Sequence, residues 1–248
     1  MISLKTKKEI IKMRDSGRIV AEILLILQEK AIIGVTTREL DAIAESESYK
    51  RKATPAFKGY GGFPYTICAS LNHKVVHGFA DDVPLLDGDL LSIDFGVQYH
   101  GYFGDAAITI PIGQIDDEKK CLNEATRESL VLAIAAAQAG KRVSDISFAV
   151  QHCVESRGFS VVRDFVGHGI GQKLHEAPQV PNFGQPGHGP RLKPGMVLAI
   201  EPMINAGCAE VEILADGWTA VTADGRPSSH FEHTVAITAD GPVILTLP

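Results

Sequence analysis

Two aspartates lie inside neighbouring apolar runs in the stretch LLSIDFGVQYHGYFGDAAITI, residues 90–110. Polar and apolar residues alternate with period two in both runs, which predicts a β-hairpin with its turn near Tyr99 and His100. This turn sets Asp94 roughly opposite Asp105, and cross-strand neighbours are about 5 Å apart. Like charges at that spacing repel each other. Either water solvates this face of the hairpin, or a cation lies between the two carboxylates.

Two more acids share this setting on other expected strands. Glu201 ends the apolar strand in GMVLAIEPMI, just before a proline. In SSHFEHTVAIT, Glu232 shares its face with His230 and Thr234, while the apolar residues point the other way. A solvated surface would now have to explain four strand acids at once, and it becomes the weaker of the two explanations.

Three histidines could add imidazole ligands or proton donors. His168 and His175 are seven residues apart among glycines in VGHGIGQKLHEAPQVPNFG, and His77 lies in VVHGFADD. Glycines allow the backbone to approach its neighbours closely. A lone histidine in such a segment is more often structural than a ligand, so the histidines alone decide nothing.

Composition excludes several classes of function. The chain has 248 residues, a net charge of −6, 45% hydrophobic and 22% charged residues, and no long Lys/Arg cluster. These values are typical of a globular protein and argue against nucleic acid or a membrane as the main partner. Charges throughout residues 1–30 argue against a signal peptide. The cysteines form no CxxC and predict free thiols in a reducing compartment, so the cytoplasm is the expected location. They are Cys68, Cys121, Cys153 and Cys208.

The elements that must position these side chains fall into two similar halves. Caps and stop signals predict helices from Thr6 to about residue 30, from Thr36 to about residue 52, over 117–139, and from Ser144 to Gly158. Strands are expected near 65–71 and 74–79. In each half, helices, a loop and strands follow in the same order. We therefore expect one α+β domain over 1–248, with pseudo-symmetric halves of about 1–112 and 113–248.

Equivalent positions of these halves are 106 or 107 residues apart. Gly34 corresponds to Gly140 at an offset of 106, and an offset of 107 carries Asp94 onto Glu201. The strands are expected to be antiparallel, with helices covering one face of the sheet.

Five motifs in order then resemble a known family: HGFADD, SIDFGVQYHGYFGDAAIT, GHGIGQKLHEAPQVPNFG, LKPGMVLAIEPM and HFEHTVAIT. Nearly the whole chain resembles type I methionine aminopeptidases of the bacterial kind, which have the pita-bread (creatinase/aminopeptidase) fold. The resemblance implies a curved antiparallel sheet with helices on its outer face. It also implies removal of the initiator methionine, when the second residue is small, by metal-activated water.

The resemblance also implies the residues of the site. Five would hold two divalent ions: Asp94, Asp105, His168, Glu201 and Glu232. Asp105 and Glu232 would bridge both ions, and Glu201 would also be the general base. His175 would hydrogen-bond the oxygen of the tetrahedral intermediate, and His77 would hold the scissile amide or help the leaving group. Four carboxylates balance two divalent ions in charge, and this donor set suits Co, Mn or Fe(II), with Zn or Ni as further candidates.

By position, the wall of the methionine pocket would comprise Tyr60, Phe63, Cys68, Leu174 and Trp218. Leu174 departs from the family pattern, because the residue before the histidine at position 175 is usually aromatic. Phe79-Ala80 replaces the usual Ile-Pro after His-Gly. One Na or K ion is also implied. Its ligands would be Asn72, Lys74 through its carbonyl, and Ser228.

The implied partners are nascent polypeptides that begin with Met, with transient ribosome contact, and the chain is expected to be a monomer. Two rival functions stay open. An Xaa-Pro peptidase of the same fold normally carries an extra N-terminal domain. A non-catalytic relative should have lost some of the ligands, whereas all five are present here.

Overall fold

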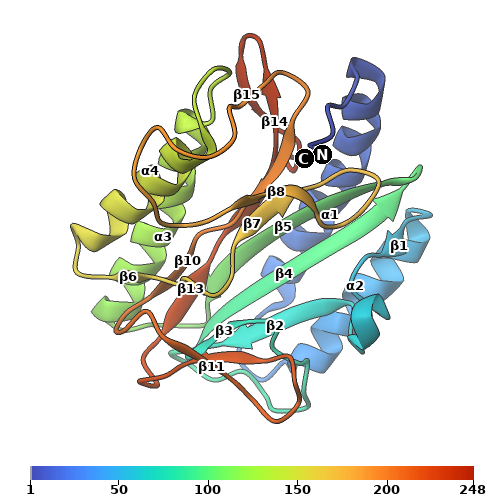
Figure 1. Ribbon diagram of the computed structural model, residues 1–248. Helices are drawn as coiled ribbons and strands as arrows, with labels where there is room; N and C mark the ends of the chain where they lie inside the picture. Colours follow the sequence, from blue (N-terminus) through green and yellow to red (C-terminus); the bar gives the residue numbers. More distant parts are fainter. Residues whose placement is uncertain (1) are drawn as a thin grey trace.

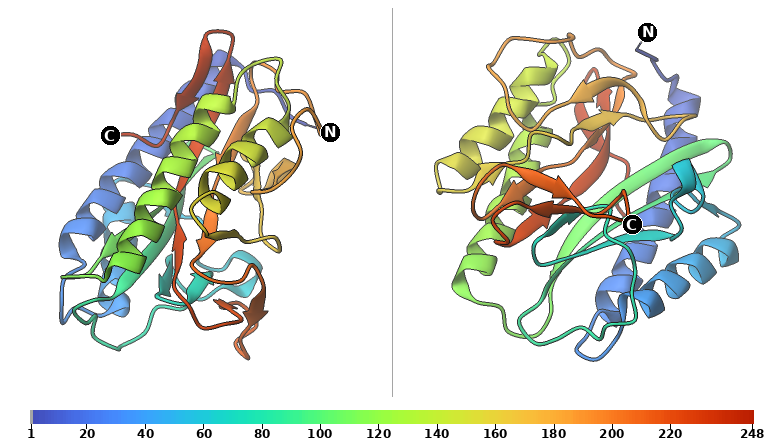
Figure 2. Two further views of the ribbon diagram at one scale, coloured as in Figure 1. Left: turned by 90° about the vertical axis from the view of Figure 1, so that its left-hand side faces the viewer. Right: turned by 60° about the horizontal axis from the view of Figure 1, so that its bottom comes forward.

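The computed structural model describes residues 2–248, which form a curved antiparallel sheet with helices packed on one side (Figure 1). The left view of Figure 2 shows α1 and α3 on the same side of the sheet. The α+β prediction is confirmed.

Four α-helices follow the predicted order. They are α1 (Lys7–Lys30), α2 (Thr37–Lys50), α3 (Asp117–Ala136) and α4 (Val143–Glu155). The first two begin as predicted, because the hydroxyls of Thr6 and Thr36 accept a backbone N–H three residues later, at 3.3 and 3.1 Å.

Three helix boundaries were predicted wrongly. Helix α4 ends at Glu155 rather than Gly158, because the N–H of Arg157 already turns back to Val154 O at 3.0 Å. Helix α3 ends before residue 139, because the N–H of Ala137 already turns back to Ile134 O at 3.0 Å. Helix α4 begins before Ser144. The carboxylate of Asp145 accepts the N–H of Arg142 at 2.8 Å, which closes the first turn one residue earlier. The Ser144 hydroxyl instead donates to a loop carbonyl.

The main sheet has the strand order β1-β4-β5-β14-β9-β7-β8, with β2 paired to β4 and β15 paired to β14. Its strands are β1 (Thr54–Pro55), β2 (Ile67–Leu71), β4 (Leu90–Tyr99), β5 (Tyr102–Pro111), β7 (Gly167–Gly169), β8 (Glu176–Val180), β9 (Val197–Ile200), β14 (Glu232–Thr238) and β15 (Gly241–Ile244). Two smaller sheets contain β3 (Lys74–Val76), β6 (Ser160–Val161), β10 (Met203–Asn205), β11 (Val211–Ile213), β12 (Ala220–Thr222) and β13 (Ser228–His230). A short 3₁₀ turn, η1, spans Tyr60–Gly62.

The predicted hairpin is present, but its register differs from the prediction. Tyr99 pairs with Tyr102, so the turn is centred one residue later than expected. As a result, Asp94 lies opposite Ala107, and Asp105 lies opposite Gly96. The two aspartates are therefore diagonal neighbours rather than direct partners, about 7–8 Å apart at Cα by ordinary strand geometry.

Both faces of this hairpin are covered, and that removes the solvated-face explanation. The apolar parity of β4 packs under α1 and α2 and includes Ile93 and Phe95, both fully buried. On the polar parity Ser92, Asp105 and Thr109 are also buried, at no more than 5% exposure. The carboxylate of Asp105 thus lies inside the protein and that of Asp94 is partly buried near it, both on the face of the sheet opposite the helices.

The two predicted halves make matching hydrogen bonds. The N–H of Gly34 donates to Leu85 O at 2.8 Å, and that of Gly140 donates to Leu192 O at 2.9 Å. Both glycines have positive φ, at 89° and 90°, a conformation that suits glycine after a helix. Residues related by these offsets of 106 and 107 therefore make equivalent contacts in the two halves. The division into halves as folding or functional units stays a prediction.

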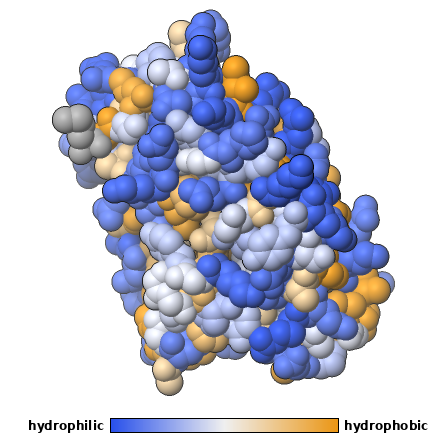
Figure 3. All heavy atoms as spheres, turned by 90° about the vertical axis from the view of Figure 1, so that its right-hand side faces the viewer, coloured by the Kyte–Doolittle hydropathy of each residue, from blue (hydrophilic) through white to orange (hydrophobic). Residues whose placement is uncertain are grey.

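The outer surface is mostly polar on the side drawn in Figure 3, where hydrophobic residues form small groups between hydrophilic ones. Such scattered apolar residues are normal on a protein surface. Within residues 2–248, no helix is long and apolar enough to cross a membrane. All four cysteines are free thiols, as predicted.

Candidate metal centre and active site

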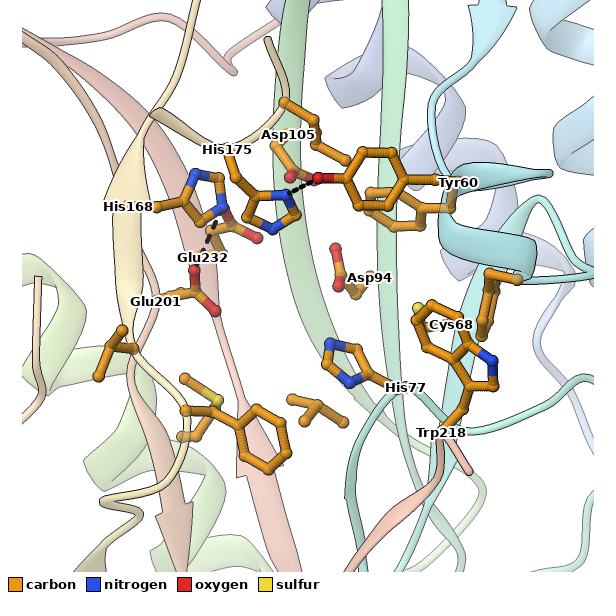
Figure 4. Close-up of a pocket in the computed structure, with 17 residues that line it drawn as sticks. Tyr60, Cys68, His77, Asp94, Asp105, His168, His175, Glu201, Trp218 and Glu232 are labelled. Carbon is orange, nitrogen blue, oxygen red and sulfur yellow. Dashed lines mark hydrogen bonds and ion pairs between the residues drawn. The ribbon is translucent and has the colours of Figure 1, made fainter. Parts of the chain in front are cut away.

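One cavity of about 190 Å³ opens on the inner face of the sheet (Figure 4). It brings together every predicted divalent-metal, catalytic and pocket residue. Its walls contain Tyr60, Phe63, Cys68, His77, Asp94, Asp105, His168, Leu174, His175, Glu201, Trp218 and Glu232. In Figure 4 the acids and His168 lie at the centre and on one side, whereas Tyr60, Cys68 and Trp218 lie on the other.

Three adjacent strands place two of the acids around one small residue. Ala107 on β5 pairs with Asp94 on β4 and with Glu232 on β14. Directly paired residues point to the same face of a sheet. Since the central side chain is a methyl group, the two carboxylates face the space above it.

Asp105 lies two residues before Ala107 on the same face. Its backbone is fixed by Thr234, whose hydroxyl donates to Asp105 O at 2.7 Å and accepts the Asp105 N–H at 3.1 Å. Opposite it, a Cβ on Gly96 would lie 3.1 Å from Asp105 Oδ1. The glycine therefore leaves room for this carboxylate.

His168 enters the site from β7, whose backbone lies very close to those of β8 and β9. A Cβ on Gly167 would lie 2.4 Å from Ala199 O, and one on Gly169 would lie 2.2 Å from Ala177 O. The predicted use of glycines for close backbone approach is confirmed. The Nδ1 of His168 is 2.9 Å from Gly169 O. Because a carbonyl only accepts, Nδ1 carries the proton and the Nε2 lone pair faces the cavity.

Glu201 follows β9 directly and completes this side of the site. Its Oε1 is 3.5 Å from His168 Nε2, and its Oε2 is 3.8 Å from Nε2 of the fully buried His230. The side chain of Asn182 donates to Glu201 O at 3.0 Å and so holds its backbone.

Burial dominates the electrostatics of these groups. It raises the pKa of Asp94, Glu201 and Glu232 well above the usual carboxyl range, and the charge of Asp105 adds to the rise in each case. The pKa of Asp105 itself is raised to about 7, chiefly by burial. Burial also lowers the pKa of His168 to about 4 and keeps it neutral. Within residues 2–248, no ion pair joins any of these carboxylates to a lysine or arginine.

This arrangement fits divalent cations. Ligand atoms of Asp105, His168 and Glu232 all lie within 4.8 Å of one another. Buried carboxylate oxygens of Asp94, Asp105 and Glu232 have no hydrogen-bond partner in the described structure. Unpaired buried carboxylates are costly, whereas a bound cation compensates them. The neutral imidazole with a free Nε2 is the form that binds metals.

A family model described as metallopeptidase family M24 matches residues 11–239. The chain belongs to metallopeptidase family M24. Methionine aminopeptidase of Clostridium perfringens is 54% identical over 247 residues, covering 100% of this chain and 99% of that protein. Methionine aminopeptidase 1 of Bacillus subtilis is 53% identical, with 99% of each covered.

Solved structures place this M24 chain in the predicted fold. Methionine aminopeptidase from Thermotoga maritima matches with a TM-score of 0.98 at 45% identity over 100% of both chains. Prolidase from Pyrococcus furiosus matches with 0.81 at 25% identity, over 99% of this chain and 65% of that one. The resemblance to methionine aminopeptidases, the pita-bread fold and the prediction of a metal-dependent aminopeptidase are confirmed.

The two further histidines of this M24 enzyme approach the cavity from loops. Nδ1 of His175 lies 2.9 Å from the Tyr60 hydroxyl, and its ring centroid lies 4.2 Å from that of His168. When the hydroxyl donates to Nδ1, the Nε2–H of His175 is free to donate into the cavity. His77, at φ 58°, packs edge-on against Phe165 and Trp218.

Aromatic side chains make the apolar end of the cavity. Phe63 contacts Trp218 and Phe79 edge-to-face, with ring centroids 5.2 and 5.5 Å apart. Phe79, which departs from the family pattern, therefore supports the wall through ring packing. Leu174, the second departure, is buried in the same apolar cluster. These contacts show how the pocket is built, and its assignment to methionine stays a proposal.

Sequence reasoning missed several residues of the site. The cavity is also lined by Phe57, Val76, Phe165, Val166 and Met203. Their positions next to the motifs, such as Phe165 and Val166 before Gly167-His168, were an available signal. His230 was predicted to share a strand face with Glu232 but was given no role in the site, yet it lies beside Glu201. In the structure it ends β13, whereas Glu232 begins β14.

The monovalent-cation residues stay a prediction. Asn72 and Ser228 do lie together, since the N–H of Ser228 donates to Asn72 O at 2.8 Å. Lys74 lies on β3 of the neighbouring small sheet.

Filling the space above Ala107 should disrupt metal binding without unfolding the chain. In Ala107→Leu, three added carbons would stand between Asp94 and Glu232, and overpacking of a core costs about 1–3 kcal/mol. We expect the metal content of purified protein to fall by at least half, measured by elemental analysis. Ala107→Gly is the control and should keep its metal. Full metal content in the leucine variant would contradict the arrangement described here.

Proposed function

We propose that this chain removes the N-terminal methionine of nascent polypeptides when the second residue is small, with the divalent ions held as a dinuclear centre. The observation that carries the proposal is a single cavity with a cation-binding group of buried acids at one end and an apolar aromatic wall at the other. An aminopeptidase needs a metal site and an apolar wall in one cavity, because it must bind one side chain and the free amine beside the scissile bond.

The residues that would hold the ions are Asp94, Asp105, His168, Glu201 and Glu232. When bound, the ions supply the Lewis acidity that makes water a nucleophile near neutral pH. The mostly oxygen donor set suits Mn, Fe(II) or Co, with Zn or Ni as further candidates.

The chain's own residues do the rest of the chemistry. Glu201 takes the proton of the attacking water and later passes it to the leaving amine. His175 donates from Nε2 to the oxygen of the tetrahedral intermediate. His77, from the loop after β3, hydrogen-bonds the scissile amide. The apolar wall around Phe63 and Trp218 receives the methionine side chain and excludes water.

Peptide cleavage tests this proposal directly. Methionine should be released from Met-Ala-Ser and Met-Gly peptides, and Gly-Pro peptides should stay intact. Cleavage of Gly-Pro peptides would favour the Xaa-Pro alternative, and no cleavage of either by metal-loaded protein would favour a binding protein. Ribosome contact, a monomeric state, the cytoplasmic location and the Na or K site at Asn72, Lys74 and Ser228 remain part of the proposal.

His175→Ala should lose about 10²–10³-fold in kcat, which is the effect of removing one preorganised donor to a developing oxyanion. Its metal content should not change, because His175 is not among the proposed ligands. Methionine release and elemental analysis on the same sample would show both. A kcat within threefold of the parent value would remove this residue from its assigned role.

The protein should be a poor substrate for itself. Met1 lies outside the described residues, but residue 2 is the β-branched Ile2, which is larger than the small second residues that we propose the enzyme accepts. A longer side chain near His77 would push the carbonyl away, and a displacement of about 1 Å can cost on the order of 10²-fold. Mass spectrometry of untagged protein should show Met1 retained. Ile2→Ala should be processed, and a parent protein that mainly begins at Ile2 would contradict the proposal.

A further inference from the structure

His175 reaches the cavity from a loop, unlike the acids, which lie on or next to strands of the main sheet. The loop, residues 171–175, joins the end of β7 to β8. Within the cavity, the ring is held by one hydrogen bond, to the Tyr60 hydroxyl at 2.9 Å. Tyr60 is itself exposed. Something outside the cavity must therefore help to fix this loop.

Lys5, near the N-terminus, contacts the loop from behind. Its side chain is only 4% exposed, which is unusual for a lysine, and its ammonium forms an ion pair with the carboxylate of Glu176. Glu176 is the residue directly after His175. The other oxygen of the same carboxylate accepts the N–H of Lys173 at 3.2 Å. One carboxylate thus joins the N-terminal segment to the loop.

The lysine side chain also packs on the start of the loop. A Cβ on Gly171 would lie 2.4 Å from Lys5 Cε and 2.6 Å from Glu176 Oε1. The backbone of Gly171 is tied to the hairpin, because its carbonyl accepts the N–H of Phe103 at 2.8 Å. The loop is therefore held at both ends, by the sheet at its first residue and by the ion pair after its last.

Lys5 is itself anchored. Its N–H donates to Gly195 O at 2.6 Å, and a Cβ on Gly195 would lie 2.8 Å from Lys5 O. Immediately after it, Thr6 caps α1. The ammonium is thus carried by a backbone that is fixed on both sides.

We propose that Lys5 and Glu176 form a clasp that positions the imidazole of His175, so that Lys5 is a positioning residue for catalysis although it does not line the cavity. The inference rests on the proposed role of His175. A partly buried ion pair contributes little to net stability, but loss of one partner leaves the other charge uncompensated. Freed from Lys5, Glu176 would turn toward water, and β8 would move with it at the residue next to His175.

The test is a double-mutant cycle on kcat with a Met-Ala-Ser peptide. Displacement of a donor by about 1 Å can cost on the order of 10²-fold. Lys5→Met should therefore lower kcat by about 10–100-fold, with KM changed by less than about threefold and metal content unchanged. In a His175→Ala background the same change should lower kcat by less than about threefold, because no ring remains to be misplaced. The control is Lys7→Met, which removes an exposed lysine of the same segment.

Two kinetic results would overturn the clasp: parent-level kcat in Lys5→Met, or an equal loss in both backgrounds, which indicates a general effect on folding. If Lys5→Met does not fold, Glu176→Gln serves instead with the same expectations, since it keeps an acceptor for the Lys173 N–H.

A second measurement does not depend on activity. The ring ¹⁵N resonances of His175 should shift in Lys5→Met and stay unchanged in Lys7→Met. Unchanged resonances in both variants would overturn the clasp. A parent protein that cleaves no methionyl peptide would instead contradict the proposed function, and the resonances would still decide whether the clasp positions His175.

Discussion

Glu201→Gln is expected to lower kcat for a Met-Ala-Ser peptide by on the order of 10³-fold or more. A single general acid–base group typically contributes 10²–10⁴-fold, and this residue is also a proposed metal ligand. The amide keeps the shape of the carboxylate but cannot take a proton from water. The substitution changes the charge and basicity of the group beside His168 and His230. It changes the side-chain volume very little.

Metal analysis separates the two roles of Glu201. If the glutamine variant keeps its metal and still loses activity, the loss belongs to proton transfer. If metal falls as well, the loss of a ligand contributes. Glu212→Gln, which alters an exposed acid on β11, should behave like the parent protein. Near-parent turnover in Glu201→Gln would exclude the residue as general base.

Thorough removal of metal is expected to abolish hydrolysis, leaving less than about 1% of the initial rate, and added Mn, Co or Fe(II) should restore it. No other group in the cavity can supply the Lewis acidity that the proposed chemistry requires. The fold should survive, because two large hydrophobic clusters lie between the sheet and the helices, on the face opposite the acids. Rebinding of metal should raise the melting temperature, since a cation that binds only the native state stabilises it.

The controls for this experiment are spectroscopic. Circular dichroism of the metal-free protein should show the same helix and strand content as the loaded protein. Mg added at the same concentration tests whether charge alone is enough. Full activity in a sample shown by elemental analysis to be metal-free would contradict the metal-dependent mechanism.

Local patterns in the sequence predicted much of the fold. Capping boxes at Thr6 and Thr36 located two helix starts, because the cap is made by residues only three positions apart. The hairpin was visible in its alternation. Its register was not, because Tyr99 and His100 offered a turn centre one residue away from the true one, and the shift depends on backbone pairing over all of β4 and β5.

The site was predicted differently. The alternation of polar and apolar residues identified four acids on polar strand faces. Only the family resemblance grouped them with His168 and assigned their roles. Strand order, which lays Glu232 next to Ala107, depends on pairing between residues about 125 positions apart. Wall residues such as Val76 and Met203 were missed because an apolar residue at a cavity looks the same in sequence as one in a core.

The seam between β5 and β14 joins the two predicted halves through only two register pairs, Glu232 with Ala107 and His233 with Ala106. Asp105 and Glu232 stand on either side of that seam. An ion held by both carboxylates would therefore act as a cross-link between the two halves of the chain at this two-pair ladder. Its loss should let the seam open before either half melts. Amide hydrogen exchange would then quicken first at residues 105–107 and 232–234 and leave the centres of α1 and α3 protected.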